Sequence, residues 1–227
     1  MARPQRGNDA LGRSSRGAGQ RRRVVFVFTE GEVTEPSYLD IITEVGVLKN
    51  PAAKVELRIA NRKKKSDRKP IDLVEMAADF LREKTREAKR AKLKGAAAQP
   101  QVWCLFDHDN HPRVPEAMKL AKEAGVHVAF SHPCFEVWRL AHYKAVTGSF
   151  EGVCDLAADR LPFQRGSEDA ANPKLVLPDQ VLGRFTQARD NARRMNDQHG
   201  DHVPRFDRDP YTDMHTFVED ALGIASY

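Results

Sequence analysis

Two aspartates separated by one residue, Asp107 and Asp109, stand directly after the apolar run Val102–Phe106. A third acid, Glu30, stands near the end of a similar run, Val24–Phe28, and a glycine follows it. Short β-branched and aromatic runs of this kind are typical of strands buried on both faces, as in parallel sheets. Ligands of such sheets bind beyond the carboxyl ends of the strands. If the two strands are parallel neighbours, the three acids converge on one crevice.

Carboxylates brought together in this way predict a metal ion. They repel one another and would partly protonate unless a cation neutralises them. Oxygen ligands at this density suit Mg²⁺ or Mn²⁺ better than zinc. The glycine after Glu30 permits close backbone approach. Glu30, Asp107 and Asp109 are therefore the predicted metal ligands and catalytic residues.

Further groups near these acids leave alternatives open. Glu35 is close enough in sequence to Glu30 to supply another ligand. Glu136 begins an amphipathic segment, where it either interacts with a helix dipole or points back into the crevice as a ligand. Three histidines near the predicted strand ends are ordinary loop residues or candidates for a general base or a phosphate contact. They are His108, His111 and His132.

Alternating strand and helix signals position these residues. Apolar runs and their boundaries predict strands at Val24–Phe28, Val55–Ile59, Val102–Phe106 and Val126–Phe130. Helices are expected from about Pro36 to Gly46, from Pro70, and from Pro115 to Ala124, because proline and glycine mark their starts and stops. The order predicts an α/β fold with a mostly parallel sheet of about four strands flanked by helices.

The rest of the chain has helical periodicity. Cys134–Tyr143 is amphipathic, Lys174–Gln198 is expected to be mostly one helix with a possible break near Gly183, and Thr212–Leu222 is expected to be a terminal helix capped by Thr212. Three parts follow: a disordered Arg/Gly-rich tail (1–23), an α/β core (24–132) and a helical C-terminal part packed on that core (133–227). The helical part could support a homodimer, although no heptad seam is present.

The positive charge of the chain is concentrated in its first residues. The net charge is +5, and residues 1–23 contain seven arginines and one aspartate, so that the remainder carries about −1. Such a tail either binds nucleic acid through phosphate attraction or only aids solubility. A second basic stretch lies between the second strand and the next helix and is a predicted nucleic-acid contact. Its members are Arg62, Lys63, Lys64, Lys65, Arg68 and Lys69.

Composition limits the other classes of protein. No run approaches the roughly 18 apolar residues that a membrane span needs. The N-terminus shows no secretory signal pattern. The three cysteines are widely spaced, and their odd number argues against a disulfide framework. We therefore expect a cytoplasmic protein that does not contact membranes.

The two acidic turns also resemble a known pattern. The segments "VFVFTEGEVTEPSYLDII" and "VWCLFDHDN" are similar to the Toprim pattern of topoisomerases, primases and OLD-type nucleases, which combines a glutamate–glycine turn with a later D-x-D. With "SHPCFEVWRLAHY" and "DPYTDMHTFVEDAL", they resemble the RloB family, whose members are similar to Toprim proteins and are encoded near restriction–modification genes. The matching segments cover most of residues 24–225.

This resemblance implies a function. Glu30 corresponds to the Toprim glutamate, and Asp107 with Asp109 to the D-x-D pair, which hold Mg²⁺ and act on phosphodiesters. OLD-type nucleases tend to place an aspartate four residues after the glutamate, whereas this chain has Thr34 there and Glu35 next, so that one or two metal ions remain alternatives. The resemblance also implies phage defence with a partner ATPase. The expected activity is a Mg²⁺-dependent nuclease acting on DNA or RNA.

Two other functions are compatible with the sequence. The chain could be a binding module in which a degenerate Toprim-like site binds a nucleotide or a nucleic acid, or docks on a partner, without cleavage. A haloacid-dehalogenase-type phosphatase also has a D-x-D after a strand, but it typically continues with Thr or Val where His111 stands, and it leaves Glu30 unexplained. No P-loop sequence is present, so ATP hydrolysis by that route is not expected.

Overall fold

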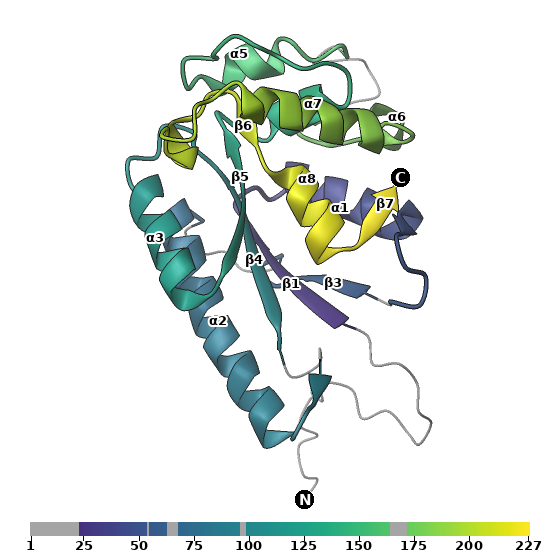
Figure 1. Cartoon of the computed structure of the whole chain (residues 1–227), viewed down its shortest axis with the longest axis vertical. Coiled ribbons are helices and arrows are strands. Elements are labelled where there is room, and N and C mark those ends of the chain that lie inside the picture. The colour runs from purple at the N-terminus through teal and green to yellow at the C-terminus, as the bar shows by residue number, and fades with distance from the viewer. Residues whose placement is uncertain (1–22, 54, 63–67, 96–98, 164–171) are drawn as a thin grey trace, which may run out of the picture.

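The computed structural model describes residues 23–53, 55–62, 68–95, 99–163 and 172–227. Its centre is a five-stranded sheet with the order β3-β1-β4-β5-β6 (Figure 1). The strands are β1 (Arg23–Thr29), β3 (Val55–Ile59), β4 (Gln101–Asp107), β5 (His127–His132) and β6 (Tyr211–Thr212). All neighbours are parallel except β5 and β6, which are antiparallel. The predicted α/β class with a mostly parallel sheet is confirmed.

The four predicted strands are present with small changes at their ends. The sequence did not predict β6, or the two-stranded antiparallel sheet formed by β2 (Val47–Leu48) and β7 (Ile224–Ser226). These strands have two or three residues each, which is too short for an apolar period to be visible. The expected count of about four strands therefore becomes five in the main sheet.

Helices bury both faces of the sheet, as the continuous apolar runs predicted. Figure 1 shows α2 (Pro70–Arg90) and α3 (Val114–Ala124) on one side and α1 (Thr34–Val45) on the other. Side chains of β1 alternate between the two cores: Phe26 and Phe28 pack with residues of α2 and α3, whereas their neighbours Val25 and Val27 pack with residues of α1. Since neither face meets water, all four positions are apolar.

The C-terminal part contributes to the same core. Residues of α4 and α7 share one hydrophobic cluster with β1 and α1, and β6 joins the main sheet. In Figure 1, α5, α6 and α7 lie beyond one end of the sheet. The remaining elements are α4 (Glu136–Ala141), α5 (Cys154–Ala158), α6 (Pro178–Val181), α7 (Phe185–Asp197), η2 (Arg205–Asp207), α8 (Met214–Thr216) and η3 (Phe217–Ala221).

Helix boundaries in this part differ from the expectations. The helix expected over Lys174–Gln198 is two helices, α6 and α7, separated at Gly183, which has a φ of +72°. A residue with positive φ cannot continue a right-handed helix, and glycine adopts it without strain. The expected N-cap Thr212 is wrong, because this residue belongs to β6 and Asp213 is the N-cap of α8, although the Met214 N–H donates to Oγ1 of Thr212 at 3.4 Å.

No helix in the described ranges combines the length and the apolar character that a membrane span requires. Residues 1–22, which make up nearly all of the predicted tail, lie outside these ranges.

Candidate functional site

The predicted acids meet at the point where the connections of the sheet reverse direction. From β1 the chain crosses to β3 on one side, and β4 then lies on the other side of β1. The carboxyl ends of β1 and β4 are therefore adjacent at a topological switch point, where sheets of this type bind ligands. Glu30 directly follows β1 and Asp107 ends β4. The Asp107 N–H donates to Oε2 of Glu30 at 2.9 Å, which fixes the glutamate at this switch point.

The turn after Glu30 is built around Glu35. The Gly31 N–H donates to Oε1 of Glu35 at 3.0 Å, and a Cβ on Gly31 would overlap that carboxylate. A side chain at position 31 would therefore displace the Glu35 carboxylate, and glycine allows the close approach that the sequence indicated. Because α1 begins at Thr34, Glu35 lies in its first turn and points back toward Glu30, with only 4% of its surface exposed.

Two further residues support this turn: Asn61, which the sequence did not single out, and Arg68, which was predicted only as a nucleic-acid contact. Asn61 extends the ladder between β3 and β1: its Oδ1 accepts from the Thr29 N–H at 3.1 Å, and its Nδ2 donates to the Thr29 carbonyl at 2.8 Å. The guanidinium of Arg68 donates to the carbonyls of Gly31 and Asn61 at 3.2 and 3.0 Å. Asn61 stands two residues after β3, but an asparagine at such a position is also common at surfaces, so the sequence did not point to this role.

An Asn61→Ala variant is expected to lose about 1 to 3 kcal/mol of folding free energy, because the buried Thr29 N–H would lose its acceptor. Urea unfolding of both proteins measures this difference. The exposed neighbour Arg62 supplies the matched control, since Arg62→Ala leaves the Asn61 contacts intact. Equal stability of Asn61→Ala and wild type would contradict this role.

The D-x-D turn is held by the segment that follows β5. The Phe135 N–H donates to Oδ2 of Asp107 at 3.0 Å, and the Asp109 N–H donates to the Pro133 carbonyl at 3.0 Å. Asp109 and Asn110 have positive φ values of 32° and 55°, a conformation that Asp and Asn tolerate better than most residues. The turn directs Asp107 inward, whereas Asp109 is exposed at the rim.

Burial and mutual repulsion raise the pKa values of the inner carboxyl groups. Burial, with a further contribution from the charge of Asp109, raises the pKa of Glu30 to about 7. The hydrogen bond from the Asp107 N–H acts in the opposite direction and lowers this pKa. Burial, followed by repulsion from Glu30 and Glu136, raises the pKa of Glu35 to about 7. Burial and repulsion from Glu35, Glu30 and Glu136 raise the pKa of Asp107 well above its usual range. Ionising all of these acids at once requires a compensating positive charge.

The acids are hard oxygen donors, which fits Mg²⁺ or Mn²⁺. Their spacing is wider than that of a closed cation cage. In the described ranges, the three ligand atoms that come within 4.8 Å of one another belong to Cys134, Glu136 and Cys154, and not to the predicted three acids. Glu30, Asp107 and Asp109 therefore share one end of the sheet without already forming a three-ligand cage.

Histidines complete the surroundings of Glu30. Nε2 of His111 lies 2.9 Å from Oε1 of Glu30. His108 and His132 stack on each other with ring centroids 4.1 Å apart. Burial, and then the neighbouring His108, lower the pKa of His132 to about 4. Of the three histidines, His111 is therefore the one with a direct contact to a predicted catalytic acid.

The predicted basic contacts are only partly described. Lys63, Lys64 and Lys65 lie outside the described residues. Arg62 is exposed and pairs with Asp40 of α1, and Lys69 is exposed directly before α2. Arg68 supports the turn after β1, and its role in binding nucleic acid stays a prediction.

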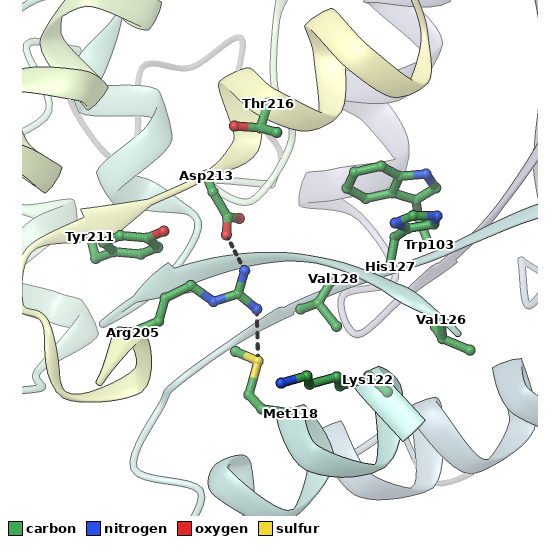
Figure 2. A pocket seen from close by; sticks show the side chains of 11 residues that line it. Trp103, Met118, Lys122, Val126, His127, Val128, Arg205, Tyr211, Asp213 and Thr216 are labelled. Atoms are coloured by element: carbon green, nitrogen blue, oxygen red, sulfur yellow. Dashed lines mark hydrogen bonds and ion pairs between the residues drawn. The ribbon is translucent and has the colours of Figure 1, made fainter. Parts of the chain in front are cut away.

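A cavity lies elsewhere, where residues of β5, β6 and α3 meet. It has a volume of about 430 Å³, and Figure 2 shows Arg205 reaching from its rim to Asp213 and to the sulfur of Met118. None of the predicted acids lines it. The acidic site at the strand ends is therefore separate from this cavity.

The structure joins Cys134 and Cys154 in a disulfide, so the expectation drawn from the odd cysteine count is wrong for this pair. The turn after β5 and the start of α5 bring the two residues together across 20 positions, which spacing alone does not reveal. Cys104, which lies in the apolar strand β4, is buried and forms no disulfide.

Comparison with known proteins agrees with this architecture. The family described as RloB-like protein matches residues 25–220, which include all five strands of the main sheet and every acid discussed above. Neither the curated proteins nor the solved structures contain a match to the chain. The family match covers well over half of the sequence, and the chain therefore belongs to the RloB-like protein family.

Proposed function

We propose that this chain is a nuclease that depends on Mg²⁺ or Mn²⁺ and cleaves phosphodiester bonds in DNA or RNA. One observation carries the proposal: Glu30, Glu35 and Asp107 converge at the switch point of a parallel sheet, where burial and repulsion raise the pKa of each. An arrangement that opposes its own ionisation is costly to the fold. It is explained if a cation and an anionic substrate occupy the site during function.

The donor set suits a hard divalent cation. Glu30, Asp107 and Asp109 would hold it, with Glu35 and Glu136 as further candidates for a second ion. When bound, such a cation stabilises the negative charge that develops on a phosphate during cleavage. Asp107 is held for this task by the Phe135 N–H, and Glu30 by the Asp107 N–H.

The pair formed by Glu30 and His111 would handle protons. A group with a pKa of about 7 exchanges protons efficiently near neutral pH, and the Glu30 carboxyl meets this condition. Nε2 of His111, 2.9 Å from Oε1 of Glu30, can share or relay that proton. Glu30 is therefore the proposed general acid or base, and His111 the residue that orients it.

The test is cleavage of labelled single-stranded DNA, duplex DNA and tRNA by purified protein with Mg²⁺ or Mn²⁺. Metal-dependent cleavage that EDTA stops, and that a Glu30→Gln variant lacks, is the expected result. The proposal includes phage defence with a partner ATPase, so the assay is repeated with any ATPase whose gene lies next to the gene of this protein. Absence of cleavage of every substrate, with and without that ATPase, would contradict the nuclease.

One observation favours a non-catalytic binding module as the second candidate. Both carboxylate oxygens of Glu30 already have partners, Asp107 and His111, and the acids do not form a three-ligand cluster in the described ranges. A binding module needs no cation here. Its partner would be a nucleotide, a nucleic acid, another protein or a second copy of the chain. It predicts that Glu30→Ala leaves partner binding unchanged.

Replacing Lys63, Lys64 and Lys65 together with serine is expected to weaken nucleic-acid binding and reduce its salt dependence. Each lost phosphate contact lowers the slope of log affinity against log salt by about 0.7 to 0.9, so the triple change should lower it by about 2 to 3. Fluorescence anisotropy at several salt concentrations measures the slope. Serine at the exposed lysines Lys119, Lys144 and Lys174 is the matched control. Equal slopes for the two triple variants would count against the loop.

A further inference from the structure

Two sulfurs and a carboxylate lie close together beside the acidic site. Cys134 lies between Pro133 and Phe135, the two residues that hold the D-x-D turn, and Cys154 begins α5. Oε2 of Glu136 lies 3.7 Å from Sγ of Cys154, and the three ligand atoms lie within 4.8 Å of one another. The two cysteines are not part of the proposed nuclease site, and Glu136, a candidate there only for a second ion, is assigned to this cluster instead.

One of the spacings already fits tetrahedral coordination, and the two sulfurs, now bonded, would have to separate to about 3.8 Å after reduction. Zinc binds sulfur at about 2.3 Å and carboxylate oxygen at about 2.0 to 2.2 Å, which places a sulfur and an oxygen of the same tetrahedron about 3.5 to 3.7 Å apart. The observed separation of 3.7 Å between Cys154 Sγ and Glu136 Oε2 falls at the end of this range. Thiolate ligands select zinc over Mg²⁺ or Ca²⁺. We propose that Cys134, Cys154 and Glu136 form a site for a thiophilic divalent cation such as Zn²⁺ when the two cysteines are reduced.

The polypeptide keeps these ligands together without help from the disulfide. Oδ2 of Asp209 accepts hydrogen bonds from the N–H groups of Phe150 and Gly152, both at 3.0 Å. The segment that leads to Cys154 is thereby fixed to Asp209, in the loop before β6, and a Cβ built on Gly152 would lie 3.1 Å from Oδ1 of Asn110 in the D-x-D turn. Breaking the sulfur–sulfur bond therefore leaves Cys154 near Cys134 and Glu136.

The disulfide is then the oxidised, metal-free state of the same pair. A dithiol reductant supplies two electrons and two protons, becomes a cyclic disulfide and converts the bonded cysteines to two thiols. Cation binding then releases the thiol protons, because thiolates are the ligands. Three protein ligands leave the fourth tetrahedral position to water or to an oxygen of a bound molecule.

Cobalt titration of reduced, metal-free protein tests the site. One equivalent of Co²⁺ should bind and give a thiolate-to-cobalt charge-transfer band, which excess Zn²⁺ removes. Cys134→Ser and Cys154→Ser should abolish the band. Glu136→Gln should lower the affinity for Co²⁺ by at least roughly 10–100-fold. This is the loss typical of removing a residue that only hydrogen-bonds to a metal ligand. Cys104→Ala is the matched control and should keep the band, since Cys104 is buried elsewhere in the core.

The oxidised state provides the second arm. Glutathione disulfide should convert the dithiol to the disulfide, yield two equivalents of glutathione and release one equivalent of Zn²⁺ to a chromogenic chelator. An Asp107→Asn variant should keep the cobalt band, so failure of the proposed nuclease would not affect this result. The inference is overturned if reduced wild type gives no band, if the band persists with both cysteines replaced by serine, or if excess dithiol leaves the disulfide intact.

Discussion

An Asp107→Asn variant should lose phosphodiester cleavage by about 10³-fold or more and yet unfold at a higher temperature than the wild-type protein. The loss follows because a ligand that neutralises developing phosphate charge is worth several kcal/mol, and each 1.36 kcal/mol is about a factor of ten in rate. The gain follows because burial and repulsion from Glu35, Glu30 and Glu136 raise the pKa of Asp107. Asparagine removes that repulsion and can still accept from the Phe135 N–H.

Rate measurements and thermal melting of Asp107→Asn, both without added metal and with it, separate the two effects. Asp109→Asn is the matched control, because Asp109 is exposed at the rim of the same turn. Its cleavage should also fall, whereas its melting temperature should stay close to that of wild type. Retained cleavage in Asp107→Asn would contradict a catalytic role for this carboxylate. A lower melting temperature without metal would show instead that the carboxylate stabilises the fold.

A Glu35→Gln variant is expected to be more stable than wild type above neutral pH and equally stable at low pH. The Glu35 pKa rises from 4.5, its ordinary value, to about 7 in the folded protein. The carboxyl therefore contributes stability that is fully present below pH 4.5 and is lost as the pH rises through 7. The difference in unfolding free energy between the two proteins should grow over this pH interval and reach on the order of 3 kcal/mol. Part of this difference is due to Glu30, which repels Glu35.

Urea unfolding at pH 4, 5.5 and 8 measures this gap. Glu44→Gln provides the control, since Glu44 is exposed on the same helix and should show no comparable opening. Mg²⁺ should narrow the gap at pH 8, because a cation favours the ionised carboxyl. If the difference in unfolding free energy between the two proteins were the same at all three pH values, the pKa of Glu35 would not differ between the folded and the unfolded protein, which would contradict this prediction.

The sequence predicted the part of the fold that repeats a strong local pattern. The runs beginning at Val24 and Val102 gave β1 and β4, and Gly46 and Gly125 gave the ends of α1 and α3. Because parallel strands place their ends together, the convergence of Glu30 and Asp107 followed from these elements and an assumed neighbour relation. The pairing of β1 with β4 confirms that relation.

The missed features depend on contacts between distant residues. Asn61 reaches Thr29 across 32 positions, and Tyr227 completes a buried chain of hydrogen bonds with Tyr38 and His142. Cys154 meets Cys134 only because the intervening segment folds back over the D-x-D turn. Nothing in the local composition distinguishes such residues from exposed polar ones, because their burial is set by tertiary packing.

Mn²⁺ calorimetry at pH 6.5, run in two buffers of different ionisation enthalpy, tests the central claim most directly. A cation held by Glu30, Asp107 and Asp109, next to Glu35, must displace protons from the three of these acids whose pKa values are raised, Glu30, Glu35 and Asp107, so binding should release about one to two protons. Asp107→Asn should abolish this binding, and Glu44→Gln should leave both the affinity and the proton count unchanged. Absence of binding by wild type, even with a phosphorothioate oligonucleotide present, or equal binding and proton release in Asp107→Asn, would contradict a cation site at the ends of β1 and β4.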